Sequence, residues 1–352
     1  MEKISEVLNN IKAVDHSIDA KTQKRLDNLT KPKGSLGKLE ELAKQLVAIT
    51  GNENPSIKNK VIFTMAGDHG VVEEGVSAFP KEVTSQMVYN FLSGGAGINV
   101  LARHVGAKVR VVDMGVAIDL DPHDELLIKK INYGTKNISK GPAMSREEAI
   151  RSIEAGIEIF EEEFGFGIDI VAAGEMGIGN TTASSAITTV FVDSPVEELT
   201  GRGTGISEES FEKKIELIKQ AIEINKPNSR DAIDVLSKVG GFEIGGLCGI
   251  ILAAASKRVP VVVDGFISTA AALIAYHLEP KVKDYLIAAH SSVERGHKLA
   301  LKHIGITPLL DLDMRLGEGT GAALAISIIE SGVKIMIEMA SFEDASVSKE
   351  NR

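Results

Sequence analysis

Cysteine and clustered basic residues are scarce in this sequence. Among 352 residues there is a single cysteine, Cys248, so no disulfide can form within the chain and a reducing compartment is expected. The apolar run around it, residues 245–250, favours a buried structural thiol over a reactive one. The net charge is −10 and no dense Lys/Arg stripe offsets it, which argues against a nucleic-acid partner.

Signals for export and membrane insertion are also lacking. The first six residues, MEKISE, contain no apolar segment of the kind that signal peptides carry. The longest stretch without a charged residue, 83–102, contains several polar side chains and is therefore a poor membrane span. These observations predict a cytoplasmic protein without a membrane span.

Several common site motifs are missing. The sequence has no HExxH or CxxC motif for zinc, no Gly-Lys-Ser/Thr of a P-loop and no Gly-x-Ser-x-Gly nucleophile elbow. A metal-dependent hydrolase that uses Asp68, His69 and Glu73 is one alternative, although metal sites normally need three or four ligands at a recognisable spacing. A hydrogen-bonded pair of Asp68 and His69 that shapes its loop is favoured, and neither a metal nor another cofactor is predicted.

Short β-branched runs alternate with helical segments over most of the chain. Such an alternation predicts an α/β fold with a doubly wound, mostly parallel sheet from about 61 to 300, flanked by helices from both chain ends. Ser145 with Glu148 forms a capping box at a helix start, Gly165 marks the end of that helix, and Ser207 opens another. The runs that predict strands are 61–65, 109–113, 168–172, 259–263 and 285–289.

Glycine-rich loops follow several of these strands, where ligands bind in doubly wound folds. The loop 174–182 leads into a helix, and its backbone N–H groups predict a phosphate site. Glu175 would repel that phosphate, so we expect it to face a ribose hydroxyl or a ring N–H. Lys213 or Lys214, downstream of the loop 201–205, is a candidate for reaching the anion. Ser291 or Ser292 is a candidate for phosphate contact or for a helix N-cap.

Glu318 is the strongest catalytic candidate, because it lies between two glycines in the segment 315–322. Glycines there allow a substrate to approach closely, and the apolar neighbour Leu316 would raise the carboxyl pKa towards that of a useful base. The alternative is an acidic residue that interacts with a helix dipole. Phe79 and the helix face that carries Gln86 could line a pocket for a flat ring, or could simply belong to the core.

In their order along the chain, these loops resemble the nicotinate-nucleotide–dimethylbenzimidazole phosphoribosyltransferase family, which makes the lower-ligand nucleotide of cobalamin. Each motif alone is weak, whereas the ordered set, which spans roughly residues 30 to 340, is specific. The matching segments are 31–37 (KPKGSLG), 66–71 (AGDHGV), 75–77 (GVS), 174–182 (GEMGIGNTT), 201–205 (GRGTG), 264–266 (DGF) and 315–322 (RLGEGTGA).

The resemblance implies a Rossmann-like large domain over 61–304, a small helical domain built from 1–60 and about 305–352, and a homodimer without metal. It implies that Glu318 is the catalytic base that accepts the proton of a benzimidazole, with Glu175 nearby. The other implied contacts are Gly177, Gly203, Lys214, Asp264 and Ser292 for the nucleotide, and Phe79, Gln86 and Leu316 for the benzimidazole.

The reaction implied by the resemblance moves 5-phosphoribose from nicotinate mononucleotide to 5,6-dimethylbenzimidazole and yields α-ribazole 5′-phosphate with inversion. The ring nitrogen of nicotinate is neutral once nicotinate has left, so the leaving group needs no acid. A single carboxylate, acting as the base for the incoming azole, therefore suffices for catalysis. Besides the metal-dependent hydrolase, the rival hypothesis is a nucleotide-binding regulatory protein that performs no transfer.

Overall fold

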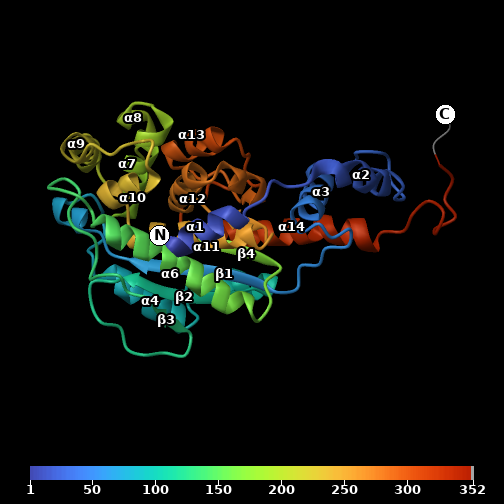
Figure 1. The fold of residues 1–352 in the computed structure, drawn as a ribbon, viewed down its shortest axis with the longest axis horizontal. Helices are drawn as coiled ribbons and strands as arrows, with labels where there is room; N and C mark the ends of the chain where they lie inside the picture. The colour runs from blue at the N-terminus through green and yellow to red at the C-terminus, as the bar shows by residue number, and fades with distance from the viewer. Residues whose placement is uncertain (350–352) are drawn as a thin grey trace.

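A computed structural model describes residues 1–349, and its centre is a parallel sheet (Figure 1). Within these residues the sheet has six strands in the order β3-β2-β1-β4-β5-β6, and every neighbouring pair is parallel. The predicted doubly wound α/β fold is therefore confirmed. The strands are β1 (Lys60–Gly67), β2 (Lys108–Gly115), β3 (Leu126–Ile128), β4 (Ile170–Met176), β5 (Val261–Val263) and β6 (Leu286–Ala288).

All five predicted strands are present, with shifted boundaries. β4 begins at Ile170, two residues later than the apolar pattern indicated. Just before it, the N–H of Asp169 donates to the carbonyl oxygen of Asn59, and the Asp169 carboxylate accepts from the N–H of Lys58. The edge strand β3 was missed, since three residues are too few to show a period. The strand order reverses between β1 and β4, where a crevice for ligands is expected.

Helices cover both faces of the sheet. Along β1, Val61, Phe63 and Met65 belong to the apolar core under α6 and α11, whereas Ile62 and Ala66 belong to the core under α4, α5 and α14. Successive side chains of β1 therefore point to opposite faces of the sheet, and the side chains on both faces are buried. This is what a parallel strand covered on both faces requires.

Fourteen α-helices lie within residues 1–349. The capping box of Ser145 and Glu148 and the N-cap at Ser207 are formed as predicted, and Cys248 is buried on α11. The helices are α1 (Glu2–Asn10), α2 (Asp19–Asp27), α3 (Lys38–Thr50), α4 (Val83–Leu92), α5 (Gly97–Val105), α6 (Arg146–Phe164), α7 (Asn180–Val192), α8 (Val196–Leu199), α9 (Glu208–Asn225), α10 (Ala232–Val239), α11 (Phe242–Ser256), α12 (Phe266–Leu278), α13 (Arg295–Ile304) and α14 (Thr320–Glu338), with 3₁₀ helices η1 (His16–Ile18), η2 (Gly70–Glu74) and η3 (Pro280–Tyr285).

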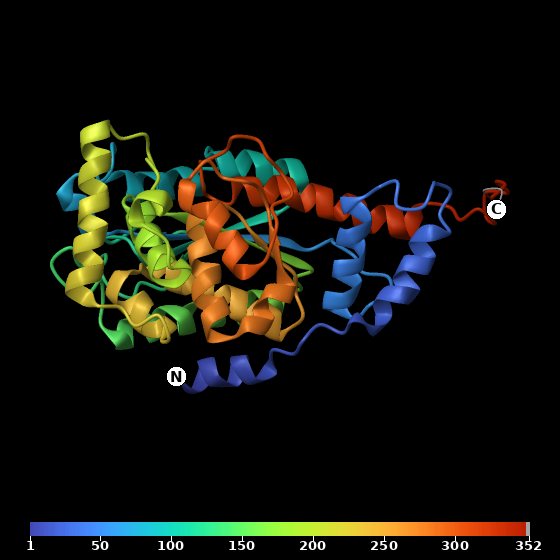
Figure 2. The ribbon, with the colours of Figure 1, turned by 90° about the horizontal axis from the view of Figure 1, so that it is seen from above.

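Two separate parts of the chain form a helical unit beyond the end of the sheet. Leu26 of α2, Val47 of α3 and Met336 of α14 share a small core, and Figures 1 and 2 show these helices at one end of the molecule. Helix α1 does not join them, because it packs against α6 and α11 beside the sheet. The division into residues 1–60 plus 305–352 and residues 61–304 stays a prediction.

Helix α14 is long and apolar enough, by length and composition, to cross a membrane. More than half of its most apolar window, 56%, is buried against the rest of the chain, and its contacts run to α3, α5, β4 and β5. A central helix of a folded core has the same length and composition, so this helix is weak evidence for a membrane span.

Candidate active site

A cavity of about 600 Å³ lies at the carboxyl ends of the strands, and we call it the strand-end cavity. Its walls come from the loops that follow β4, β5 and β6, from α4 and from the segment before α14. It is lined by Phe79, Val83, Met87, Glu175, Met176, Gly177, Ile178, Asn180, Thr181, Gly203, Thr204, Gly265, Phe266, Ile267, His290, Ser292, Glu294, Asp313, Arg315, Leu316, Gly317 and Glu318.

Glu318 enters this cavity from a turn with an unusual backbone. Its φ is +65°, and the neighbours Gly317 and Gly319 have φ of +85° and +96°. A left-handed conformation costs a non-glycine residue roughly 1–2 kcal/mol, so contacts with the surrounding structure must hold it. The left-handed φ of Gly317 favours glycine, and a Cβ there would also lie 2.2 Å from Glu175 Oε1.

The carboxyl group of Glu318 is almost fully buried, with 4% of the residue exposed. Burial raises its pKa, and a hydrogen bond from the N–H of Ile98 to Oε2 at 3.0 Å partly offsets that rise. No hydrogen bond within residues 1–349 reaches the other oxygen, Oε1. Glu318 can therefore offer a basic oxygen to a ligand in the cavity.

Two further carboxyl groups are buried near Glu318. Burial raises the pKa of Glu175 to about 8, with a further rise from Asp264, while a hydrogen bond from Asn180 lowers it. Burial also raises the pKa of Asp264 to about 7, against hydrogen bonds from backbone N–H groups at the start of α14. At neutral pH Glu175 is therefore largely a neutral acid that can donate a hydrogen bond.

Lys214 supplies positive charge behind the glycine loops. Its Nζ donates hydrogen bonds to Thr181 Oγ1 at 2.9 Å and to the carbonyl oxygen of Gly201 at 3.2 Å. Burial lowers its pKa to about 8, while the Glu294 carboxylate acts in the opposite direction. The lysine stands next to Gly203, where an added Cβ would lie 3.4 Å from Nζ.

Apolar side chains form the outer wall of the strand-end cavity. Phe79 and Leu316 are 52% and 60% exposed, so their side chains stand at the mouth. Val83 and Met87 of α4 and Met176 at the end of β4 also line the cavity. This wall suits a flat aromatic ring, because rings bind through apolar contact area.

Comparisons with known proteins relate this chain to phosphoribosyltransferases. A family model described as phosphoribosyltransferase matches residues 11–347. Nicotinate-nucleotide–dimethylbenzimidazole phosphoribosyltransferases from Geobacter sulfurreducens and Geotalea uraniireducens are 57% and 58% identical, each over 99% of this chain and 99% of that protein. A crystal structure of the enzyme so named from Thermus thermophilus is 42% identical, covers 96% of this chain and 100% of that one, and has a TM-score of 0.90.

This chain belongs to the nicotinate-nucleotide–dimethylbenzimidazole phosphoribosyltransferase family. The resemblance found in the sequence is thereby confirmed over nearly the whole chain. The comparisons identify the family but assign no role to individual residues, so those roles depend on the geometry of this chain.

Most of the residues predicted for this family's site line the strand-end cavity. These are Glu318, Glu175, Gly177, Gly203, Ser292, Phe79 and Leu316. Lys214 lies just behind the lining and is buried, whereas Lys213 is exposed, so Lys214 is the lysine on the inner side of α9. Gln86 is exposed on α4 and does not line the cavity, and its predicted contact stays a prediction.

Asp264 has a different position from the one predicted. Its carboxylate accepts hydrogen bonds from the N–H groups of Gly319 at 3.2 Å and Ala322 at 2.8 Å, and it does not line the cavity. Both oxygens are therefore engaged at the N-terminus of α14, where a negative charge is favourable. Glu318, by contrast, accepts a hydrogen bond from the N–H of Ile98 in the first turn of α5, a helix remote in sequence, and its interaction with a helix dipole stays a prediction.

The helix-cap alternative for Ser292 is not supported. Helix α13 begins after Glu294, which is its N-cap and makes no capping hydrogen bond through its side chain. The N–H of Ser292 donates to His297 Nδ1 at 2.9 Å. Glu294 was missed in the sequence, although it lines the cavity and accepts a hydrogen bond from the N–H of Gly203 at 3.0 Å. Nothing in the sequence around Glu294, which directly precedes a helix, indicates that it lines a cavity.

His69 pairs with Glu243, and not with Asp68 as predicted. The distance from His69 Nε2 to Glu243 Oε1 is 2.7 Å, and both side chains are buried. Asp68 instead accepts a hydrogen bond from the N–H of Ala117 at 2.7 Å. Burial alone would lower the pKa of His69, but the Glu243 carboxylate raises it overall. Glu243 is 174 residues away in sequence, so no local spacing reveals the pair.

The metal-dependent hydrolase finds no support in the arrangement of side chains. Within residues 1–349 no group of three His, Cys, Asp or Glu residues is placed to hold a metal ion. Glu73 is exposed on η2 and lies 4.0 Å from Lys140, whereas Asp68 and His69 are buried. The three residues proposed for that activity therefore do not form a ligand set.

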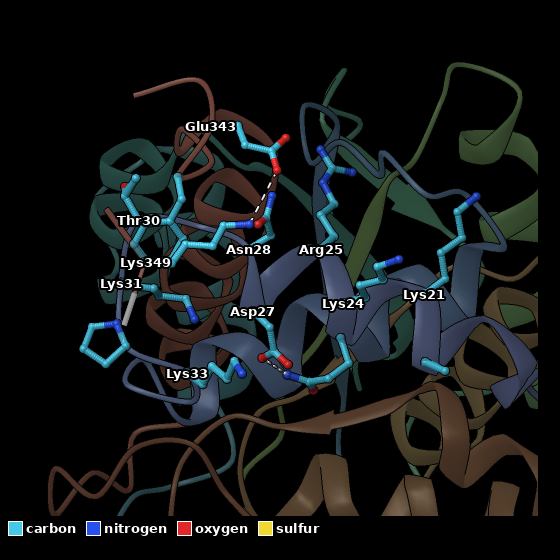
Figure 3. Close-up of a pocket in the computed structure, with 14 residues that line it drawn as sticks. Lys21, Lys24, Arg25, Asp27, Asn28, Thr30, Lys31, Lys33, Glu343 and Lys349 are labelled. Atoms are coloured by element: carbon cyan, nitrogen blue, oxygen red, sulfur yellow. Dashed lines mark hydrogen bonds and ion pairs between the residues drawn. The ribbon is translucent and has the colours of Figure 1, made fainter. Parts of the chain in front are cut away.

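A larger cavity, of about 1310 Å³, lies elsewhere (Figure 3). We call it the basic cavity, because Lys21, Lys24, Arg25, Lys31, Lys33 and Lys349 line it together with two carboxylates, Asp27 and Glu343. It lies between α2, the segment that follows α2, and residues 342–349. Its lining includes no residue of the strand-end cavity, so size alone does not locate the candidate site.

Proposed function

We propose that this protein transfers 5-phosphoribose from nicotinate mononucleotide to 5,6-dimethylbenzimidazole, giving α-ribazole 5′-phosphate and nicotinate. The observation that carries the proposal is the placement of Glu318, a buried carboxyl group with a raised pKa and one free oxygen, between an apolar wall and glycine loops. Membership of the family supplies the identity of the two substrates.

The reaction needs one base and no acid. The ring nitrogen of nicotinate mononucleotide is positively charged, so nicotinate takes the electron pair of the broken C–N bond and leaves neutral. The azole nitrogen forms the new bond to the anomeric carbon from the opposite face, which inverts that centre. The azole's other ring nitrogen loses its proton to Glu318 Oε1, since Oε2 accepts the Ile98 N–H.

The two substrates fit opposite sides of the strand-end cavity. The azole ring lies against Phe79, Met87 and Leu316, which brings its N–H towards Glu318. The phosphate lies at the loops of Gly177 and Gly203, with Lys214 behind them. Holding donor and acceptor in line supplies much of the rate, because it replaces an encounter between two free molecules.

Glu175 and Ser292 are placed to bind the ribose. Glu175 is largely neutral at pH 7, so its hydroxyl can donate to a ribose oxygen without repelling the phosphate. This resolves the difficulty of a carboxyl group in a phosphate loop. Ser292 also lines the cavity and offers a hydroxyl group.

An assay with purified protein tests the proposal. Nicotinate mononucleotide and 5,6-dimethylbenzimidazole should give equal amounts of nicotinate and α-ribazole 5′-phosphate, measured by chromatography. Nucleotide binding without any release of nicotinate would favour a regulatory protein. Loss of activity in a chelator would favour the metal-dependent reaction.

We also propose that the protein is a cytoplasmic homodimer, as the family resemblance implies. The exposed side chains of Phe79 and Leu316 at the mouth of the cavity leave apolar surface that a second copy would cover. Sedimentation equilibrium should give twice the chain mass, and a monomer at micromolar concentration would contradict the dimer. Fractionation of the producing cells should place the protein with cytoplasmic markers.

A further inference from the structure

Thr64 is a polar residue in the middle of a strand whose surroundings are apolar. It lies on β1, has no exposed surface, and shares its face of the strand with Ile62 and Ala66, which belong to the core under α14. Valine would fill the same space without a hydroxyl group. The hydroxyl of Thr64 donates a hydrogen bond to the backbone carbonyl oxygen of Glu318, at 3.0 Å and across 254 residues of sequence.

The neighbouring strand, β4, also contacts the backbone of Glu318. Thr64 pairs in register with Gly174 on β4, and a Cβ on Gly174 would lie 2.3 Å from the carbonyl oxygen of Glu318. The N–H of Glu318 donates to the carbonyl oxygen of Glu175 at 3.2 Å. Both backbone polar groups of Glu318 are thus bound by the two central strands, β1 through a side chain and β4 through its main chain.

The left-handed conformation of Glu318 depends on these hydrogen bonds to its backbone. A residue with φ of +65° between two glycines has many alternative conformations, and most of them would turn its side chain away from Ile98. The peptide that follows Glu318 cannot rotate while its carbonyl oxygen accepts the hydroxyl hydrogen of Thr64. The only donor to that oxygen within residues 1–349 is Thr64.

We propose that Thr64 is a positioning residue, which holds the Glu318 peptide so that the carboxyl group meets the azole in the strand-end cavity. It touches neither substrate, because it does not line the cavity. The proposal depends on the transfer reaction proposed above for its kinetic test, whereas its structural test does not.

Thr64→Val and Thr64→Ser separate the hydroxyl group from the volume of the side chain. Thr64→Val should lower kcat about 10- to 100-fold, because a misplaced base loses alignment with the reacting atoms. The KM for nicotinate mononucleotide should change less than about threefold, since the phosphate loops are untouched. Thr64→Ser keeps the donor and should retain most of the wild-type kcat.

Thr188→Val is a matched control. Thr188 is also fully buried and donates its hydroxyl hydrogen to a backbone carbonyl, that of Ser184 at 2.7 Å, but on α7 and away from Glu318. Its substitution should reduce thermal stability and leave kcat per folded molecule within about twofold. Equal losses of kcat in the Thr64 and Thr188 valine variants would show a general effect of removing a buried hydroxyl and would overturn the proposal.

A crystal structure of Thr64→Val provides the test that does not depend on activity. We expect the φ of Glu318 or the direction of its carbonyl to change, with loss of the contact between Oε2 and Ile98. A variant structure with Glu318 unmoved, or wild-type kcat in Thr64→Val, would refute the positioning role. If the wild-type protein itself shows no transfer, the proposed function fails, and this structure still decides the role of Thr64.

Discussion

Two buried carboxyl groups near the strand ends, Glu318 and Glu243, have opposite surroundings. Glu318 opens into the strand-end cavity and binds the backbone N–H of Ile98 through one oxygen. Glu243 has no exposed surface, pairs with the buried His69, and does not line the cavity. Burial alone therefore does not identify a base. A base also needs a free oxygen that faces the space where a substrate binds.

The same lesson applies to the cavities. The basic cavity is more than twice as large as the strand-end cavity, and six cationic side chains line it. The strand-end cavity is smaller, but carboxyl groups with raised pKa surround it, together with a buried lysine of lowered pKa. Groups with strongly shifted pKa cluster at functional sites, so they favour the strand-end cavity over the larger basic cavity.

The largest expected effect distinguishes Glu318 from every other carboxyl group. Glu318→Gln should lower kcat by about 10²–10⁴-fold, because general base assistance is lost. The KM for nicotinate mononucleotide should change little, since the amide still fills the turn. In the wild-type protein the acidic limb of the pH profile of kcat should lie above the ordinary carboxyl value, because burial raises the pKa of Glu318.

Full turnover by Glu318→Gln would remove the assigned role. The matched variant Glu330→Gln changes an acid on the outer part of α14, paired with Lys60 and Lys334, and should leave kcat within about twofold.

For Glu243 we expect the opposite of the result for Glu318, a large loss of stability with little loss of kcat. Glu243→Gln breaks a buried pair with His69 and should lower the free energy of unfolding by about 3–5 kcal/mol. The kcat of the molecules that remain folded should stay within a few fold of the wild-type value. Denaturant unfolding and active-site titration measure the two quantities separately. A large loss of kcat without loss of stability would show that Glu243 takes part in the chemistry.

A smaller effect is expected from Glu175 and depends on pH. A carboxyl pKa of about 8 in the folded state, above the ordinary value of 4.5, means that the folded protein binds the proton more tightly. The stability from this group is fully present below pH 4.5 and is lost as pH rises through about 8. Glu175→Gln should abolish this loss, which is on the order of 2 kcal/mol between pH 6 and pH 8. Parallel pH profiles of unfolding for variant and wild type would contradict the raised pKa.

The smallest expected effect concerns the apolar wall. Leu316→Ala removes a side chain at the mouth of the strand-end cavity and should raise the KM for 5,6-dimethylbenzimidazole about two- to tenfold. The matched variant Leu312→Ala changes another exposed leucine, which does not line the cavity, and it should have no measurable effect on that KM. Equal effects of the two substitutions would place the azole elsewhere.

Much of the fold could be predicted from the sequence, because continuous apolar strands and capped helices are local patterns. Glu318 and the glycine loops, which line the strand-end cavity, could be singled out because glycines around a carboxyl group are rarely chosen for stability. Hydrogen bonds between residues far apart in the sequence have no local pattern that predicts them. Nothing near His69 indicates Glu243, and nothing near Thr64 indicates that its hydroxyl binds residue 318. The position of Asp264 at a helix start depends in the same way on where α14 lies.

The most direct test of the account is a crystal structure of the protein with nicotinate mononucleotide and a benzimidazole bound. It should place the azole against Leu316, with a ring nitrogen within hydrogen-bond distance of Glu318 Oε1 and the phosphate at the loops of Gly177 and Gly203. A benzimidazole bound away from Glu318, or a Glu318 side chain turned out of the cavity, would contradict the assignment of this residue as the base.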